Sequence, residues 1–125
     1  MRRKRQVHRS GFEDRVIASL RACNLPFTYE SHKIRYVVPA SEHTYTPDIV
    51  LPNGVLIELK GYLDADARKK YVLVKSQSPD LDLRFVFQNA SKPIRKGSKT
   101  SYGIWATKNG FIWSQGSVPT EWWTD

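Results

Sequence analysis

The first regular hydrophobic pattern along the chain has the spacing of an α-helix. Four apolar residues recur at intervals of three and four and share one helical face: Phe12, Val16, Ile17 and Leu20. Ser10 and Glu13 occupy the serine and glutamate positions of a capping box, in which both side chains satisfy free amides of the first turn. We therefore expect a helix that begins at Ser10 and ends near residues 23–24, before Pro26.

Short alternating segments follow this helix. Apolar and polar side chains alternate over residues 27–30 and again over residues 34–38, which is the period of a half-buried strand. Residues 39–43, which begin with Pro39, interrupt the alternation. The pattern predicts extended segments that stop before the next pair of strands begins.

The clearest local signal in the chain is a hairpin. Residues 45–51 and 55–60 are rich in apolar side chains, and they flank Pro52, Asn53 and Gly54. An Asn-Gly pair between two such runs favours a tight hairpin turn. Because both runs are almost continuously apolar, they are typical of strands in the centre of a sheet.

The second half of the chain predicts two more helices and two more strands. Asp64 can cap a helix that runs to about Ser76, and residues 83–87 form an apolar run of strand length. A short helix is expected around residues 101–108 and a last strand around residues 111–114. The whole order favours an α/β fold with a mixed central β-sheet flanked by helices.

Positive charge dominates the chain. The 125 residues carry a formal net charge of +8, and residues 10–125 have the length of a single domain. On a small domain such a surplus favours a polyanionic partner, most often nucleic acid, over a merely basic surface. We expect a flexible basic arm over residues 1–9 and a basic loop over residues 92–99 to bind phosphates. The cations concerned are Arg2, Arg3, Lys4, Arg5, Arg9, Lys92, Arg95, Lys96 and Lys99.

Other protein classes fit the sequence poorly. No apolar run approaches the ~18 residues of a membrane-spanning helix. We expect no secretory signal, because no apolar region follows the basic N-terminus. Cys23 is the single cysteine and has no intrachain disulfide partner. A reduced, cytoplasmic location is therefore expected.

Three charged residues are set into the apolar hairpin: Asp48, Glu58 and Lys60. A turn over residues 52–54 places Asp48 directly opposite Glu58, with Cβ atoms about 5 Å apart on one face. Carboxylates this close repel one another, and a magnesium ion neutralises them while it also binds substrate phosphate. Lys60 falls on the same face, where an ammonium can orient the attacking water and stabilise the transition state of phosphodiester hydrolysis.

The alternative for these residues is a solvated strand face with surface ion pairs. Such pairs contribute only about 0–1 kcal/mol each and do not explain charges inside an apolar hairpin. The sequence therefore favours a catalytic metal site. Glu13 is a fourth candidate, since a carboxylate in the first turn of a helix can cap the helix and also lean towards a nearby metal.

Nine short motifs in order along the chain carry a family resemblance. They are Arg9-Ser-Gly-Phe-Glu-Asp14, Val38-Pro-Ala-Ser41, His43-Thr-Tyr-Thr-Pro-Asp48, Leu51-Pro-Asn-Gly54, Glu58-Leu-Lys-Gly61, Arg68-Lys-Lys70, Lys96-Gly-Ser98, Thr100-Ser-Tyr-Gly103 and Glu121-Trp122. In these motifs the chain resembles the phage endonuclease I Holliday-junction resolvases of T-odd phages, within the restriction-endonuclease-like PD-(D/E)xK nuclease superfamily. The motifs span nearly the whole chain.

The resemblance implies a magnesium-dependent endonuclease, with manganese able to substitute, that cleaves four-way junctions and other branched DNA. It implies a catalytic quartet of Glu13, Asp48, Glu58 and Lys60, in which the three carboxylates bind the metal. It also implies a homodimer with exchanged segments, in which one chain provides Glu13 and the other chain provides the remaining three residues. Residues 37–47 would then bridge the two halves.

Two other functions stay open at this point. The same quartet would serve a less selective nicking or mismatch-directed DNA endonuclease of the same superfamily. A non-catalytic protein that binds branched DNA is the other possibility. The intact Glu58 and Lys60 argue against it, because binding alone would favour the loss of carboxylates from a surface that faces phosphates.

Overall fold

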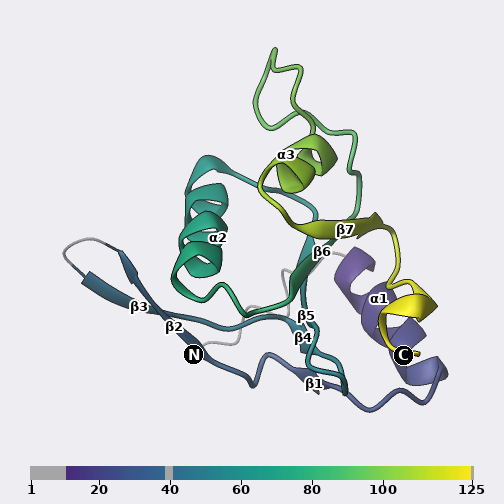
Figure 1. Cartoon of the computed structure of the whole chain (residues 1–125). Helices are drawn as coiled ribbons and strands as arrows, with labels where there is room; N and C mark the ends of the chain where they lie inside the picture. The colour runs from purple at the N-terminus through teal and green to yellow at the C-terminus, as the bar shows by residue number, and fades with distance from the viewer. Residues whose placement is uncertain (1–10, 39–40, 125) are drawn as a thin grey trace.

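The computed structural model describes residues 11–38 and 41–124, so the predicted basic arm and the capping Ser10 lie outside the described residues. The described chain forms a five-stranded sheet, a two-stranded ribbon, and helices on both faces of the sheet (Figure 1). In chain order the elements are α1 (Gly11–Ala22), β1 (Thr28–Tyr29), β2 (Ile34–Val38), β3 (Ser41–Tyr45), β4 (Ile49–Val50), β5 (Leu56–Lys60), α2 (Ala65–Gln77), β6 (Leu83–Phe87), α3 (Tyr102–Lys108), β7 (Ile112–Gln115) and the 3₁₀ helix η2 (Thr120–Trp122).

Strand β5 lies at the centre of the sheet, whose strand order is β1-β4-β5-β6-β7. The β1–β4 and β4–β5 pairs are antiparallel and the β5–β6 and β6–β7 pairs are parallel, so the sheet is mixed, as predicted. Across the turn the amide of Leu51 donates to the carbonyl of Val55 at 2.9 Å. The predicted hairpin register is therefore confirmed, and one further step along it sets Asp48 opposite Glu58.

The side chains of β5 alternate between two cores. Ile57 and Leu59 pack with α1 and η2 on one face of the sheet, while Leu56 packs with α2 and α3 on the other. Because successive side chains of a strand point to opposite faces, Glu58 and Lys60 share the face of Leu56. The two charged residues of β5 therefore lie on the face that α2 covers.

The helix ends follow the capping residues of the sequence. Asp64 accepts a hydrogen bond from the amide of Ala67 at 2.8 Å and starts α2, and Ser101 accepts from Ile104 at 3.1 Å and starts α3. Helix α1 ends at Ala22, close to the predicted residues 23–24. Within the described residues, no helix has the length and the apolar character that crossing a membrane requires.

The segment between β2 and β4 differs from the prediction. The sequence pattern predicts an interruption over residues 39–43. Residues 39–40 lie outside the described residues, but residues 41–43 belong to β3, which pairs antiparallel with β2 as a ribbon. The ribbon projects to one side beneath α2 (Figure 1), where the side chain of Gln77 accepts from the amide of Val37 at 2.5 Å. The pairing with β2 explains the difference, because β3 has a strand partner that its own polar composition did not reveal.

The predicted strand over residues 45–51 is also shorter than expected. Only Ile49 and Val50 form β4, and Tyr45 ends β3 instead. Pro47 lies in the interval and has no amide hydrogen to give to a strand ladder. The break leaves Asp48 just outside β4, at the end of the sheet, where its carboxylate can meet residues from other elements.

Candidate active site

The predicted catalytic residues converge around the start of β4 and the end of β5. Glu58 and Lys60 lie on β5, Asp48 directly precedes β4, and Glu13 lies in the first turn of α1. Asp48 and Glu58 are only 6% and 7% exposed, and no other charged side chain among the described residues is classed as buried. Burial of a carboxylate is costly unless hydrogen bonds or cations compensate it. The partners of these two residues therefore indicate what the site can do.

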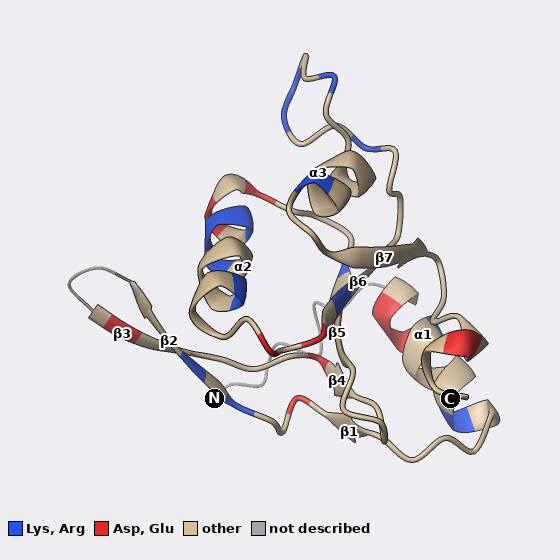
Figure 2. Cartoon of the chain, viewed as in Figure 1, with Lys and Arg blue, Asp and Glu red and all other residues tan. Residues whose placement is uncertain are grey.

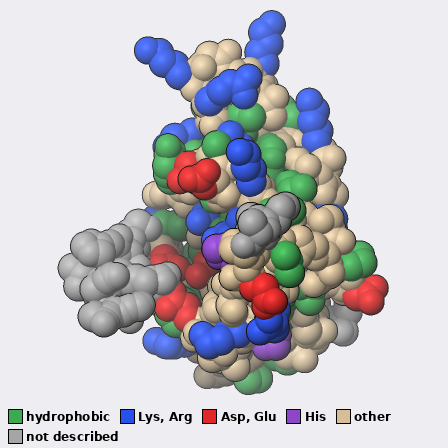
Figure 3. Space-filling model, turned by 90° about the vertical axis from the view of Figure 1, so that its left-hand side faces the viewer, with side chains coloured by type: hydrophobic (Ala, Val, Ile, Leu, Met, Phe, Trp, Pro, Cys, Tyr) green, Lys and Arg blue, Asp and Glu red, His purple; other side chains and the backbone are tan. Residues whose placement is uncertain are grey.

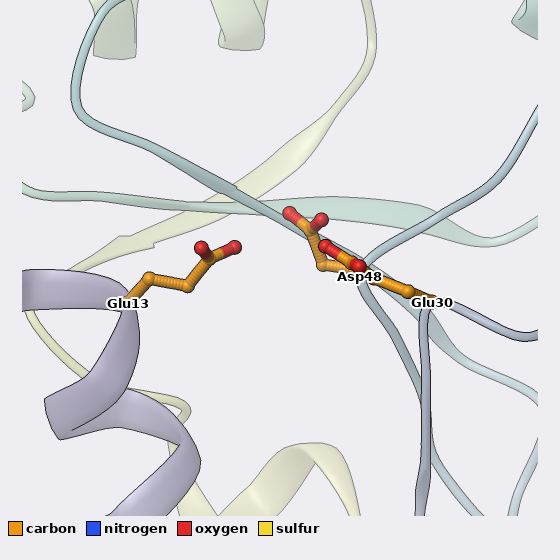
Figure 4. A group of neighbouring side chains, drawn as sticks. All are labelled: Glu13, Glu30 and Asp48. Carbon is orange, nitrogen blue, oxygen red and sulfur yellow. The ribbon is translucent and has the colours of Figure 1, made fainter. Parts of the chain in front are cut away.

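Glu13, Glu30 and Asp48 form a cluster of three carboxylates (Figure 4). Each residue offers one oxygen, and these oxygens lie within 4.8 Å of one another. Figure 4 shows Glu13 extending from α1 towards the other two carboxylates. Magnesium and manganese prefer carboxylate oxygens. The three residues could therefore hold a divalent cation, and we call them the acidic cluster.

Glu30 is the member of the acidic cluster that the sequence patterns missed. It directly follows β1, in which Tyr29 lies opposite Ile49, and its amide donates to the carbonyl of Asp48 at 2.9 Å. Its φ angle is +54°, in the left-handed region that glutamate rarely adopts, at a cost of about 1–2 kcal/mol. Such strain is often found at functional sites. The pairing of β1 with β4 places Glu30 next to Asp48, and no local sequence motif predicts that pairing.

Glu58 is held by two tyrosines rather than by the acidic cluster. The hydroxyl of Tyr45 donates to Oε1 of Glu58 at 2.6 Å, and the hydroxyl of Tyr71 donates to Oε2 at 2.9 Å. The two tyrosine rings meet edge to face, with centroids 5.8 Å apart. Nζ of Lys60 lies 3.9 Å from Oε2 of Glu58. Both oxygens of the carboxylate thus have donors, and a direct metal contact of Glu58 stays a prediction.

The electrostatics of Asp48 suit a site that receives a cation. Burial raises the pKa of Asp48 well above its usual value of 3.8, and the negative charges of Glu58 and Glu13 raise the pKa further. The amide of Leu59 donates to Oδ2 of Asp48 at 2.8 Å and opposes this shift. A nearby divalent cation would favour the ionised carboxylate and so offset the cost of its burial.

A second lysine, Lys70 of α2, lies beside Lys60. Its Nζ is 5.7 Å from the ring centroid of Tyr45 and 5.0 Å from that of Tyr71, and Nζ of Lys60 is 5.5 Å from the Tyr71 centroid. Burial lowers the pKa of Lys70, and the negative charge of Glu58 opposes this effect. The sequence patterns did not propose Lys70 as a site residue, although it ends one of the family motifs. Its role depends on the packing of α2 over β5.

The basic loop that was predicted to bind phosphates is exposed and lies apart from the acidic cluster. It connects β6 to α3, and its cations gather at the top of the molecule in Figures 2 and 3. They are Lys92, Arg95, Lys96 and Lys99. The predicted cations of the N-terminal arm, from Arg2 to Arg9, lie outside the described residues, so the structure does not place them.

Glu13 meets Asp48 of its own chain in this structure. A single chain therefore brings together all four predicted catalytic residues, and a partner's glutamate is not needed to complete the acidic cluster. The expected bridge between two chains was residues 37–47. Its residues 37–38 and 41–45 pair within one chain in the β2–β3 ribbon, and residues 39–40 lie outside the described residues. The exchanged dimer stays a prediction.

Comparison with known proteins finds a family model that matches the whole chain and two relatives that match most of it. A family model described as "Phage endonuclease I" matches residues 1–125. The protein named "Endonuclease I" from Escherichia phage T7 is 46% identical over 120 residues, which cover 96% of this chain and 80% of that protein. The protein named "Endodeoxyribonuclease 1" from Enterobacteria phage T3 is 47% identical over 114 residues, which cover 91% of this chain and 75% of that protein.

Proposed function

The chain belongs to the phage endonuclease I family, and from this premise we propose that it is a structure-selective DNA endonuclease that cleaves four-way junctions and other branched DNA. The acidic cluster carries this proposal, because it places cation ligands next to the buried Glu58 and the ammonium group of the half-buried Lys60. The name of the phage T3 relative supports DNA as the substrate.

Magnesium is the metal that this proposal requires, with manganese as a substitute. Glu13, Glu30 and Asp48 would hold it, since their oxygens already lie within 4.8 Å of one another and one of them is buried. A magnesium ion held by these residues would supply Lewis-acid polarisation of a phosphoryl oxygen and a more acidic attacking water. No step of this kind is available to the carboxylates alone, because they repel the phosphate.

Lys60 contributes positive charge next to the cluster. It lies two residues after Glu58 on the same face of β5, and its Nζ is 3.9 Å from a Glu58 oxygen. From this position the ammonium can donate a hydrogen bond to a phosphate oxygen and stabilise the charge that develops in the transition state. Glu58 is fixed in turn by Tyr45 and Tyr71, so it limits the movement of the Lys60 side chain.

The working form that we propose is a homodimer, because resolution of a junction requires cuts in two strands. The β2–β3 ribbon could form the contact between the two chains of this dimer. If β2 of one chain pairs with β3 of another, the same ladder forms between two chains, which preserves its hydrogen bonds at little cost. Glu13 of one chain would then join Asp48 of the other. Sedimentation that finds only monomers at micromolar concentration would contradict this arrangement.

Shape rather than sequence would guide recognition. The exposed cations of the loop over residues 92–99 can bind backbone phosphates, which carry no base information. A surface that reads only phosphates selects DNA by the positions of its strands, which differ between a branched and a linear duplex.

A cleavage assay with matched DNA tests the proposal. The protein is incubated with a four-way junction and with the corresponding linear duplex, with magnesium or with a chelator, beside the Lys60→Ala variant. We expect magnesium-dependent cleavage of the junction and a loss of activity in Lys60→Ala. Cleavage of neither DNA would refute the nuclease, and equal cleavage of both would identify the less selective endonuclease instead. Retained activity in Lys60→Ala would remove the role assigned to that lysine.

A further inference from the structure

A groove opens between the start of α2 and the basic loop that precedes α3. Its volume is about 590 Å³, and the lining includes Tyr62 together with four cations, Arg68, Lys92, Arg95 and Lys96. Asp64 is the acidic residue of the lining, and its side chain already caps α2. The groove is therefore positively charged and is separate from the acidic cluster, with which it shares no residue.

Tyr62 supplies an exposed aromatic ring to the groove. It is 66% exposed, the highest value among the exposed large hydrophobic side chains of the described residues. Nζ of Lys92 lies 5.4 Å from the centroid of its ring. The ring is close to one cation and is otherwise largely exposed to solvent. An exposed aromatic ring of this kind is a surface on which a nucleobase can stack.

Hydrogen bonds join the two walls of the groove, so its shape does not depend on exposed side chains alone. Nη1 of Arg68 donates to the carbonyl of Leu63 at 2.9 Å and to the carbonyl of Ile94 at 3.1 Å. The amide of Leu63 donates to the hydroxyl of Tyr102 at 3.2 Å. Arg68 thus ties the segment after β5 to the basic loop, and it fixes the two walls of the groove relative to each other.

The groove also lies close to the proposed reaction centre along the chain. Tyr62 is two residues after Lys60, a chain distance of at most about 7 Å between Cα atoms. The carbonyl of Lys60 accepts from the amide of Gln88 at 3.0 Å, which anchors this part of the chain to the sheet. A DNA strand with a phosphate at Lys60 would therefore have a neighbouring nucleotide near Tyr62.

We propose that this groove binds one unstacked nucleotide of the DNA strand next to the cleaved phosphate. The base stacks on the ring of Tyr62, and the adjoining phosphates lie against Lys92, Arg95 and Lys96. The inference rests on the proposed function, which it deepens by naming how branched DNA is recognised. Bases at a branch point are easier to unstack than bases inside a duplex, so a stacking site favours branched DNA without reading its sequence.

A thermodynamic cycle between protein and DNA tests the groove. The dissociation constant of a four-way junction is measured in chelator, where binding is separate from cleavage, for the full chain and for Tyr62→Ala and Tyr62→Phe. A series of junctions carries one abasic nucleotide at successive positions around the branch point. Lys92→Ala reports on the phosphate contacts, and Lys33→Ala removes the same charge from an exposed position that does not line the groove.

We expect one abasic position to weaken binding by the wild-type chain and by Tyr62→Phe about 5- to 100-fold. In Tyr62→Ala, the same abasic position should cause no further loss of affinity. Lys92→Ala should weaken binding of the junction more than Lys33→Ala does. Additive losses at every position would overturn the proposal, as would a Tyr62→Ala chain that binds all junctions like the wild type. Circular dichroism checks that each variant is folded.

The cycle separates this inference from the proposed function. A chain that shows the coupling between Tyr62 and one base but cleaves no DNA would refute the nuclease and keep the stacking of one nucleotide on Tyr62. A chain that cleaves junctions in magnesium but shows no coupling would keep the nuclease and refute the groove. The failure of one proposal can therefore be distinguished from the failure of the other.

Discussion

The hydroxyl of Tyr45 donates a 2.6 Å hydrogen bond to Oε1 of Glu58. This bond joins the last residue of the β2–β3 ribbon to the middle of β5, and both side chains are buried. Burial and the negative charge of Glu58 raise the pKa of Tyr45 well above its usual value, so the hydroxyl keeps its proton and remains a donor. The hydroxyl of Tyr45 therefore couples the ribbon to a residue at the candidate site.

Tyr45→Phe should destabilise the protein, because it removes this hydroxyl and leaves Oε1 of a buried carboxylate without its donor. We expect the free energy of unfolding to fall by about 1–3 kcal/mol, measured by urea denaturation. Tyr62→Phe is the matched control, since its hydroxyl is on an exposed side chain, and its effect should stay within about 0.5 kcal/mol. Equal stability of the two variants would show that the Tyr45 bond contributes nothing.

Asp48→Asn should stabilise the metal-free protein at neutral pH. The pKa of Asp48 is raised in the folded state, so between the usual value of 3.8 and the raised value the folded state binds more protons than the unfolded state. Stability in chelator therefore falls as the pH rises through this window. The asparagine side chain of the variant keeps an oxygen to accept from the amide of Leu59 but carries no charge. Thermal unfolding between pH 4 and pH 8 should show a weaker pH dependence for the variant.

A magnesium titration of the same variant gives an independent check on the metal. Bound cation stabilises the folded state, so magnesium should raise the melting temperature of the wild type more than that of Asp48→Asn. An equal rise in both proteins would place the cation elsewhere.

Glu30→Gln should weaken metal binding while the fold is kept. The substitution removes one negative charge from the acidic cluster, and affinity for hard cations depends on the number of charged ligands. We expect about a tenfold lower affinity for manganese in isothermal titration calorimetry. Glu121→Gln removes the same charge from an exposed residue outside the acidic cluster and should bind like the wild type. Unchanged affinity in Glu30→Gln would remove Glu30 from the site.

Lys70→Ala should lower the rate of cleavage more than Lys69→Ala does. The ammonium of Lys70 lies over the rings of Tyr45 and Tyr71, which hold Glu58, whereas Lys69 is exposed on the same helix. Loss of this group should loosen the tyrosines that position Glu58, and we expect kcat to fall about 2- to 30-fold, which corresponds to about 0.5–2 kcal/mol in activation free energy. Equal rates for the two variants in single-turnover assays would show that Lys70 has no part in the site.

Several parts of the molecule depend mainly on residues that are neighbours in the chain, and these parts could be predicted. The Asn53-Gly54 turn and the apolar runs beside it set the register that places Asp48 opposite Glu58, because a short loop leaves few ways to pair two strands. Asp64 and Ser101 likewise marked the starts of two helices, since a cap acts within three residues.

The residues that surround these charges come from elements that are distant in the chain. Glu30 reaches Asp48 only because β1 pairs with β4, and Tyr71 and Lys70 reach Glu58 only because α2 packs over β5. Contacts of this kind join residues that are distant in the chain, so no local spacing encodes them. Strand β3 likewise could not be predicted from local sequence, because its polar residues form a strand only through their pairing with β2. The sequence determined which charges lie on the hairpin, and packing decided their partners.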